Sequence, residues 1–160
     1  MKKLFAVLSV LFVMGTTSVF ATGIGAQFGG NVTNGGFGSG AALTFKLDNV
    51  PCVFAADLGF GQDYFTAGLT ADWWVANPKI EGTWGWYYGV GVGGAVTITN
   101  SNYGGLCVGP RAVLGTNVFI IDEHLEFYLQ GAWQPLVVIT DGVTFNWVNF
   151  PIAAGFRWWF

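Results

Sequence analysis

The sequence has little charge and, after residue 21, no long hydrophobic run. Only 9% of its 160 residues are Asp, Glu, Lys or Arg, whereas an average soluble domain carries about 25%. A water-exposed surface is difficult to build from so few charges. The net charge of −3 also disfavours nucleic-acid binding. The composition therefore indicates a membrane protein, although no segment after residue 21 has the roughly 20 apolar residues of a spanning helix.

Cysteine and histidine are also scarce, which excludes several kinds of site. The chain has two Cys and one His, too few for a zinc site. Cys52 and Cys107 are far apart in the sequence, and the strand order described below places them near opposite ends of the molecule. We therefore expect two structural thiols rather than a disulfide, and we expect no metal and no cofactor.

The first 21 residues have the layout of a secretory signal peptide. Lys2 and Lys3 precede an apolar run over 4–14, and Val19-Phe20-Ala21 offers a cleavage site. The alternative is an uncleaved anchor helix, but small and polar residues interrupt the apolar run. We expect cleavage after Ala21, which leaves residues 22–160 as a single exported domain.

The exported part alternates between apolar and small or polar residues with a period of two. Alternate side chains lie on opposite faces of a β-strand, so this pattern indicates strands and fits no helix. Clusters of Gly, Asn, Asp and Pro separate the alternating segments. The pattern predicts eight strands, over about 23–31, 38–47, 51–61, 64–75, 83–97, 105–118, 124–137 and 148–160.

The charges divide sharply between the two strand faces. One face holds apolar and aromatic residues and no charge. The opposite face holds six charged residues among many Gly, Ala and Thr: Lys46, Asp57, Asp72, Arg111, Glu126 and Arg157. The other charges of the exported part fall in the predicted connections. A soluble sandwich would present a highly charged outer face, whereas few, balanced charges among small residues suit a narrow interior where each charge needs a partner.

These patterns predict an all-β fold, an eight-stranded antiparallel up-and-down transmembrane β-barrel. Eight strands of about 11 residues leave about seven residues per connection, which matches the visible turns. Side chains fill an interior of this size, so we expect no open diffusion channel. We predict that the six charges form an ion-pair network in the lumen; the alternative is a path for protons or ions.

Two motifs resemble chemical sites but lack the required context. His124 follows Asp122 and Glu123 in a predicted turn, and we interpret it as a solvated residue rather than a member of the catalytic triad of an outer-membrane lipase, protease or palmitoyltransferase. Gly89, Gly91 and Gly94 match the spacing of a nucleotide-binding loop. No helix is predicted after them, so we assign these glycines to a strand with glycine on its lumen face.

The last ten residues, 151–160, alternate apolar positions and end in Phe. This segment resembles the assembly signal of small outer-membrane barrels of the OmpA/OmpX type. The resemblance implies that the barrel-assembly machinery recognises Phe156, Trp158 and Phe160 after transit through the periplasm. The block 108–115 is also similar to small barrels of spirochaetes. The predicted outer loops are shorter than those of many such proteins, which argues against adhesion through loops.

We therefore expect a non-enzymatic outer-membrane barrel with a structural or surface-interaction role, whose partners are the lipid bilayer and, during biogenesis, the assembly machinery. The sequence names no surface partner. A narrow pore or a conduit for small hydrophobic ligands is one alternative. A second is an exported soluble barrel of the lipocalin type, in which the apolar face would line a ligand cavity.

Overall fold

A computed structural model describes residues 22–34, 36–61, 64–99 and 102–160 and is all-β. The predicted signal peptide lies outside these residues. Within them, no helix is long and apolar enough to cross a membrane. Eight strands form the wall: β1 (Thr22–Thr33), β2 (Gly36–Leu47), β3 (Cys52–Phe60), β4 (Tyr64–Ala76), β6 (Trp84–Thr99), β7 (Asn102–Ile120), β8 (Leu125–Trp133) and β11 (Asn149–Trp159). Three short strands extend the hairpins: β5 (Lys79–Glu81), β9 (Leu136–Ile139) and β10 (Val143–Asn146).

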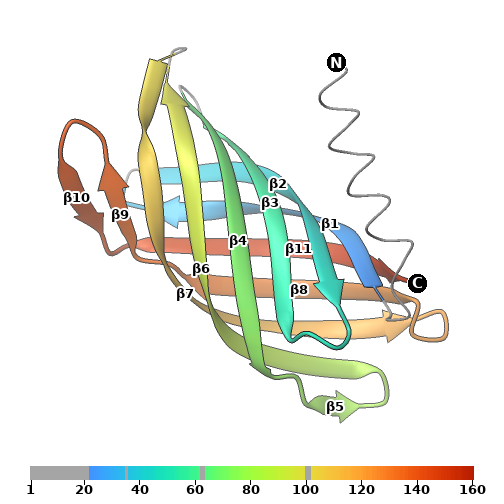
Figure 1. Cartoon of the computed structure of the whole chain (residues 1–160). Coiled ribbons are helices and arrows are strands. Elements are labelled where there is room, and N and C mark those ends of the chain that lie inside the picture. The colour runs from blue at the N-terminus through green and yellow to red at the C-terminus, as the bar shows by residue number, and fades with distance from the viewer. Residues whose placement is uncertain (1–21, 35, 62–63, 100–101) are drawn as a thin grey trace, which may run out of the picture.

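The eight wall strands close into an antiparallel barrel (Figure 1). Each pairs with its neighbours in sequence, and β11 returns to pair with β1. Following paired residues around the wall from Trp86 of β6 leads back to β6 at Val96, a stagger of ten residues. This stagger tilts the strands against the barrel axis. We call the end that carries Gly23 and Trp159, which pair with each other, the inner end, and the opposite end the outer end.

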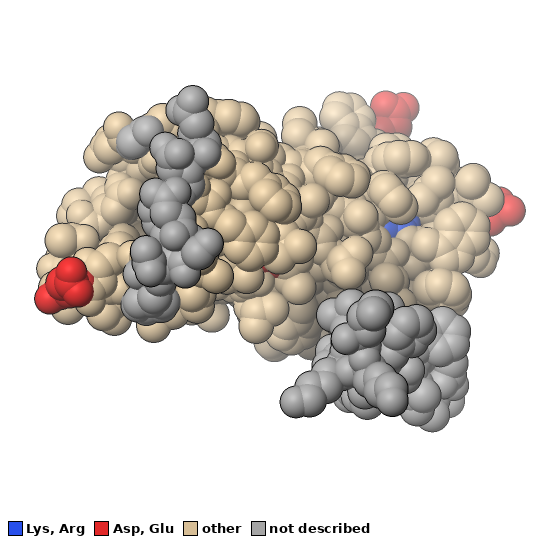
Figure 2. All heavy atoms as spheres, turned by 90° about the horizontal axis from the view of Figure 1, so that it is seen from above, with Lys and Arg blue, Asp and Glu red and all other residues tan. Residues whose placement is uncertain are grey.

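The two faces of the wall differ as the alternation predicts. Large apolar side chains on the outside are strongly exposed, for example Leu43 at 70% and Leu69 at 69%. All six charged residues of the wall strands have the opposite parity and face the lumen. In Figure 2 the visible surface is largely uncharged, and the conspicuous acidic residues lie at its two ends.

One predicted strand is interrupted in the structure. The segment 124–137 was expected to be continuous, but β8 ends at Trp133 and β9 begins at Leu136. Pro135 has no N–H to give to a ladder, and β7 changes partner here, from β8 at Ala112 to β9 at Val108. The Gln134 backbone N–H instead bonds to the carbonyl of Asn149, whose side-chain amide donates to the Gln134 carbonyl. Beyond the break, β9 stays paired with β7 and β10 pairs with β9, so this hairpin extends the sheet past the end of β8 (Figure 1).

Candidate functional site in the barrel lumen

The inner half of the lumen is filled by charged and aromatic side chains. We call this set the inner cluster; its members are Lys46, Trp74, Tyr87, Glu126, Tyr128, Arg157 and Trp159. All are buried, and Tyr87, Glu126 and Arg157 have no exposed area. They come from β2, β4, β6, β8 and β11, so the cluster spans the lumen instead of lining one wall.

Glu126 and Arg157 form the centre of the inner cluster. They are paired across β8 and β11, and Arg157 Nη1 lies 3.0 Å from Glu126 Oε2. The Glu126 carboxylate also accepts hydrogen bonds from Asn117 Nδ2 at 2.9 Å and Trp159 Nε1 at 3.1 Å. The guanidinium carbon of Arg157 lies 4.0 Å from the centre of the Tyr128 ring. The carboxylate is therefore well satisfied, whereas Arg157 Nε and Nη2 are buried without a hydrogen-bond partner among the described residues, so the hydrogen bonds offset only part of the desolvation of the pair.

Lys46 has an aromatic partner rather than an acidic one. Its ammonium lies 5.0 Å from the ring centres of both Trp74 and Trp159, a cation–π geometry. Trp74 in turn stacks on Tyr87, with centroids 3.9 Å apart and planes 14° from parallel. Among the described residues, no carboxylate lies within 4 Å of the Lys46 ammonium.

A second ion pair lies nearer the outer end. Arg111 of β7 binds Asp72 of β4 through two nitrogens, Nε at 2.8 Å and Nη2 at 3.2 Å, and both side chains are nearly fully buried. The remaining terminal nitrogen, Nη1, donates to Gln134 Oε1 at 2.6 Å. This bidentate geometry fixes the guanidinium and neutralises its charge locally.

The outer half of the lumen contains a cavity of ≈ 280 Å³ with both polar and apolar walls, which is room for about nine water molecules. We call it the outer cavity. The polar or chemically reactive side chains around it include Gln27, Asp57, Cys107, Arg111, Gln134 and Asn149. Among the described residues, Asp57 makes no ion pair.

The structure therefore places all six predicted charges in the lumen but does not join them into one network. Four of them form two separate pairs, Arg157–Glu126 and Arg111–Asp72, whereas Lys46 and Asp57 pair with no opposite charge in the part of the chain that the structure describes. The charges are also distributed unevenly. The inner cluster carries one excess positive charge, and the group of Asp57, Arg111 and Asp72 at the outer cavity carries one excess negative charge.

The remaining residues singled out from the sequence lie on the outer face of the barrel, in a turn or within a strand. Phe156, Trp158 and Phe160 are exposed on the outward parity at the end of the chain. His124 is exposed in the β7–β8 turn, where its Nδ1 contacts the carbonyl oxygens of Ile121 and Asp122. Gly89 and Gly91 face the lumen in β6 as predicted, whereas Gly94, which pairs with the outward Leu69, has the outward parity. No cluster of potential metal ligands occurs among residues 22–160 where described.

Both cysteines are free, as expected from their separation. Cys52 is buried at the inner end of β3, and Cys107 lies on the wall of the outer cavity.

Several lumen groups were not singled out from the sequence as site residues, although the alternation already places Gln27, Tyr128 and Gln134 on the face of the charges. Gln27, Gln134 and Asn149 supply amide groups in the outer half, and Trp74, Tyr87 and Tyr128 fill the inner half. The parity of their strands places most of them inside. Their partners depend on the ten-residue stagger, which no local pattern in the sequence specifies.

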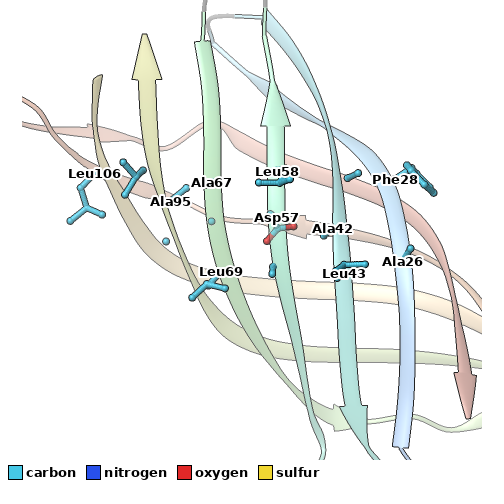
Figure 3. Close-up of a pocket in the computed structure, with 15 residues that line it drawn as sticks. Ala26, Phe28, Ala42, Leu43, Asp57, Leu58, Ala67, Leu69, Ala95 and Leu106 are labelled. Atoms are coloured by element: carbon cyan, nitrogen blue, oxygen red, sulfur yellow. The ribbon is translucent and has the colours of Figure 1, made fainter. Parts of the chain in front are cut away.

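The outer surface also has an apolar groove of ≈ 880 Å³. Figure 3 shows it on the wall that includes β1, β2, β3, β4 and β6, with Asp57 near its middle. Alanines and glycines form much of the groove, and larger side chains such as Phe28, Leu43 and Leu69 border it.

Comparisons with known proteins support the fold alone. No protein-family model matches the sequence, and no curated protein matches it. Among solved structures, the chain is similar to Neisserial surface protein A. The two share 14% sequence identity with a TM-score of 0.52, over 89% of this chain and 98% of the other. The protein therefore has the closed, eight-stranded antiparallel β-barrel fold of that surface protein.

Proposed function

We propose that the chain is a non-enzymatic integral protein of a bacterial outer membrane, with its inner end toward the periplasm and a structural or surface-interaction role. The observation that carries this proposal is the charge partition. All six charges of the wall strands face the lumen, while the outside presents apolar side chains. A closed sheet with an apolar outside and a polar lumen is the form in which strands cross a bilayer.

Export and assembly belong to the same proposal. The segment 1–21 directs the chain through the inner membrane, and cleavage follows Ala21. Phe156, Trp158 and Phe160 then present an aromatic edge to the barrel-assembly machinery. Their exposure on the outer face of the last strand supports this role.

Extraction of the envelope tests the membrane assignment. Detergent should be required to release the protein, and the folded barrel should migrate differently on a gel before and after heating. Photoreactive lipid probes should label Trp84 and Phe156, which are both exposed on the outside. Release into aqueous buffer without detergent would instead support the lipocalin-type alternative.

Planar bilayer recording separates a sealed barrel from a narrow pore. The inner cluster crosses the lumen with side chains of five strands, so we expect no steady conductance. Persistent single-channel openings by the folded protein would favour the pore alternative. The same openings in a heat-denatured sample would identify a contaminant.

A further inference from the structure

Two buried side-chain oxygens on the wall of the outer cavity have no hydrogen-bond partner among the described residues. Asn149 is 1% exposed, and its Oδ1 has no hydrogen-bond partner among the described residues. The Oδ1 of Asn31, also on the cavity wall, is buried and has no partner there either. Both oxygens accept hydrogen bonds and cannot donate them. An occupant that satisfies them must carry N–H or O–H groups.

The cavity also has an excess negative charge. Arg111 is the cationic side chain on its wall, and Asp72 neutralises it through two contacts. Asp57 then makes no ion pair among the described residues, although Gln27 hydrogen-bonds to its carboxyl group. It lies on the same interior row of the sheet as Ala42, Gly68, Ala95 and Cys107. A carboxylate in a confined, partly desolvated space attracts cations and repels anions.

From these two observations we propose that the outer cavity is a binding site for a small protonated amine. Asp57 supplies the charge, and the side-chain oxygens of Asn31 and Asn149 accept hydrogen bonds from the ammonium group. A divalent metal ion fits less well, because Ca²⁺ takes six to eight oxygen ligands and prefers several carboxylates. The inner cluster lies beyond the site and limits the amine to the outer half of the lumen.

The reactivity of the Cys107 thiol can report on access to the outer cavity. It lies on the wall of the outer cavity, and replacing Cys52 by Ser removes the other thiol. Methanethiosulfonate reagents form a disulfide with the thiolate and release methanesulfinate, so the rate measures how often the reagent reaches Cys107. The experiment uses the full chain folded in detergent and compares a trimethylammonium reagent with a sulfonate reagent of similar size.

We expect the cationic reagent to react faster than the anionic one, with a rate ratio about tenfold above that of a free thiol in solution, since one charge acts oppositely on the two reagents. Asp57→Asn should return the ratio to that of the free thiol, and Asp57→Glu should preserve it. Asp141→Asn is the matched control, because it removes a negative charge at the same end of the barrel from an exposed position. It should leave the ratio within about twofold.

Direct binding is measured with the uncharged methyl reagent. Methylammonium chloride should slow modification of Cys107 in a saturable way, and Asp57→Asn should abolish this protection. Tetramethylammonium has no N–H group and should protect less, as should sodium. Heat-dependent gel migration confirms that each variant is folded.

Three results would overturn the proposal. The first is no reaction of Cys107 with any reagent, which would show that the cavity is closed. The second is an unchanged rate ratio in folded Asp57→Asn. The third is equal protection by methylammonium and sodium, which would reduce the effect to ionic strength. None of these results bears on membrane insertion, because the measurements are made in detergent.

Discussion

At Glu126, one carboxylate accepts hydrogen bonds from three side chains on two neighbouring strands. The residue has no exposed area, and neither has its partner Arg157. Removing one member of a buried pair leaves the other charge without compensation, which is far more destabilising than removing both.

Substitutions at this pair should show that asymmetry. We expect Glu126→Ala to lower the free energy of unfolding by about 3–5 kcal/mol. The double variant Glu126→Leu with Arg157→Met should lose much less, because no isolated charge remains. Urea unfolding of protein folded in lipid vesicles measures both. Equal losses in the two proteins would show that packing, and not the isolated charge, determines the effect.

The β7–β8 turn contains three successive non-glycine residues in the left-handed region: Ile121, Asp122 and Glu123, with φ of 55°, 52° and 65°. A β-branched side chain is poorly suited to this conformation, and Ile121 is also 58% exposed, so it gains little from burial. Asp is better tolerated there.

Replacing Ile121 by Asn should therefore stabilise the barrel. We expect a gain of about 0.5–1 kcal/mol, because Asn adopts the left-handed conformation at lower energy. The midpoint of urea unfolding should rise in Ile121→Asn and not in Ile121→Val, which keeps the β-branch. A lower midpoint in the Asn variant would mean that the exposed Ile makes a contact that stabilises the fold.

Between adjacent strands, interior glycines make room for the large residues of the inner cluster. A Cβ at Gly155 of β11 would meet the Tyr128 hydroxyl of β8 at 2.5 Å, and one at Gly23 of β1 would meet the Trp159 ring at 2.9 Å. Gly131 of β8 faces outward instead, and nothing lies within 4 Å of an added Cβ there. Glycine is thus required on one face of the sheet and replaceable on the other.

The pair Gly155→Ala and Gly131→Ala tests this difference. We expect Gly155→Ala to destabilise the barrel by about 1–3 kcal/mol, because the added methyl group overpacks the lumen. Gly131→Ala should be neutral or slightly stabilising. The two variants are compared by their unfolding midpoints in the same lipid. Similar losses of stability in both would show that the effect comes from the backbone and not from overpacking of the lumen.

The strands themselves could be predicted well from the sequence. Alternation and turn residues located all eight wall strands, because each signal is local to a few residues. The break at Gln134–Pro135 was missed, because the apolar residues that follow it, 136–139, also suit a strand. At the lumen, parity placed Asp57 and Lys46 inside, but their lack of ionic partners depends on stagger and on distances across the barrel.

For the molecule as a whole, the uncharged outer wall should tolerate charge only near its ends. Leu69 lies midway along β4 and is 69% exposed, and Val143 lies on the β9–β10 hairpin and is 62% exposed. In a bilayer the first would contact the hydrocarbon core and the second would lie near or beyond the interface. Leu69→Arg should therefore lose about 2–4 kcal/mol in vesicles and Val143→Arg about 0–1 kcal/mol. Equal effects would contradict the proposed orientation in the membrane.

The wall strands differ in length, and in the proposed orientation this difference determines how far each hairpin would extend beyond the membrane. β3 has nine residues and β7 has 19, so at about 3.3 Å per residue they extend about 30 Å and about 60 Å. Tilted by roughly 45°, the first spans about 21 Å, slightly less than the apolar band of about 25 Å, and the second spans about 44 Å and exceeds this band by about 19 Å. The first half of β7 extends past the end of β8, whose last residue pairs with Ala112. In the proposed orientation this part of the β6–β7 hairpin would lie beyond the membrane, within reach of an antibody or a phage.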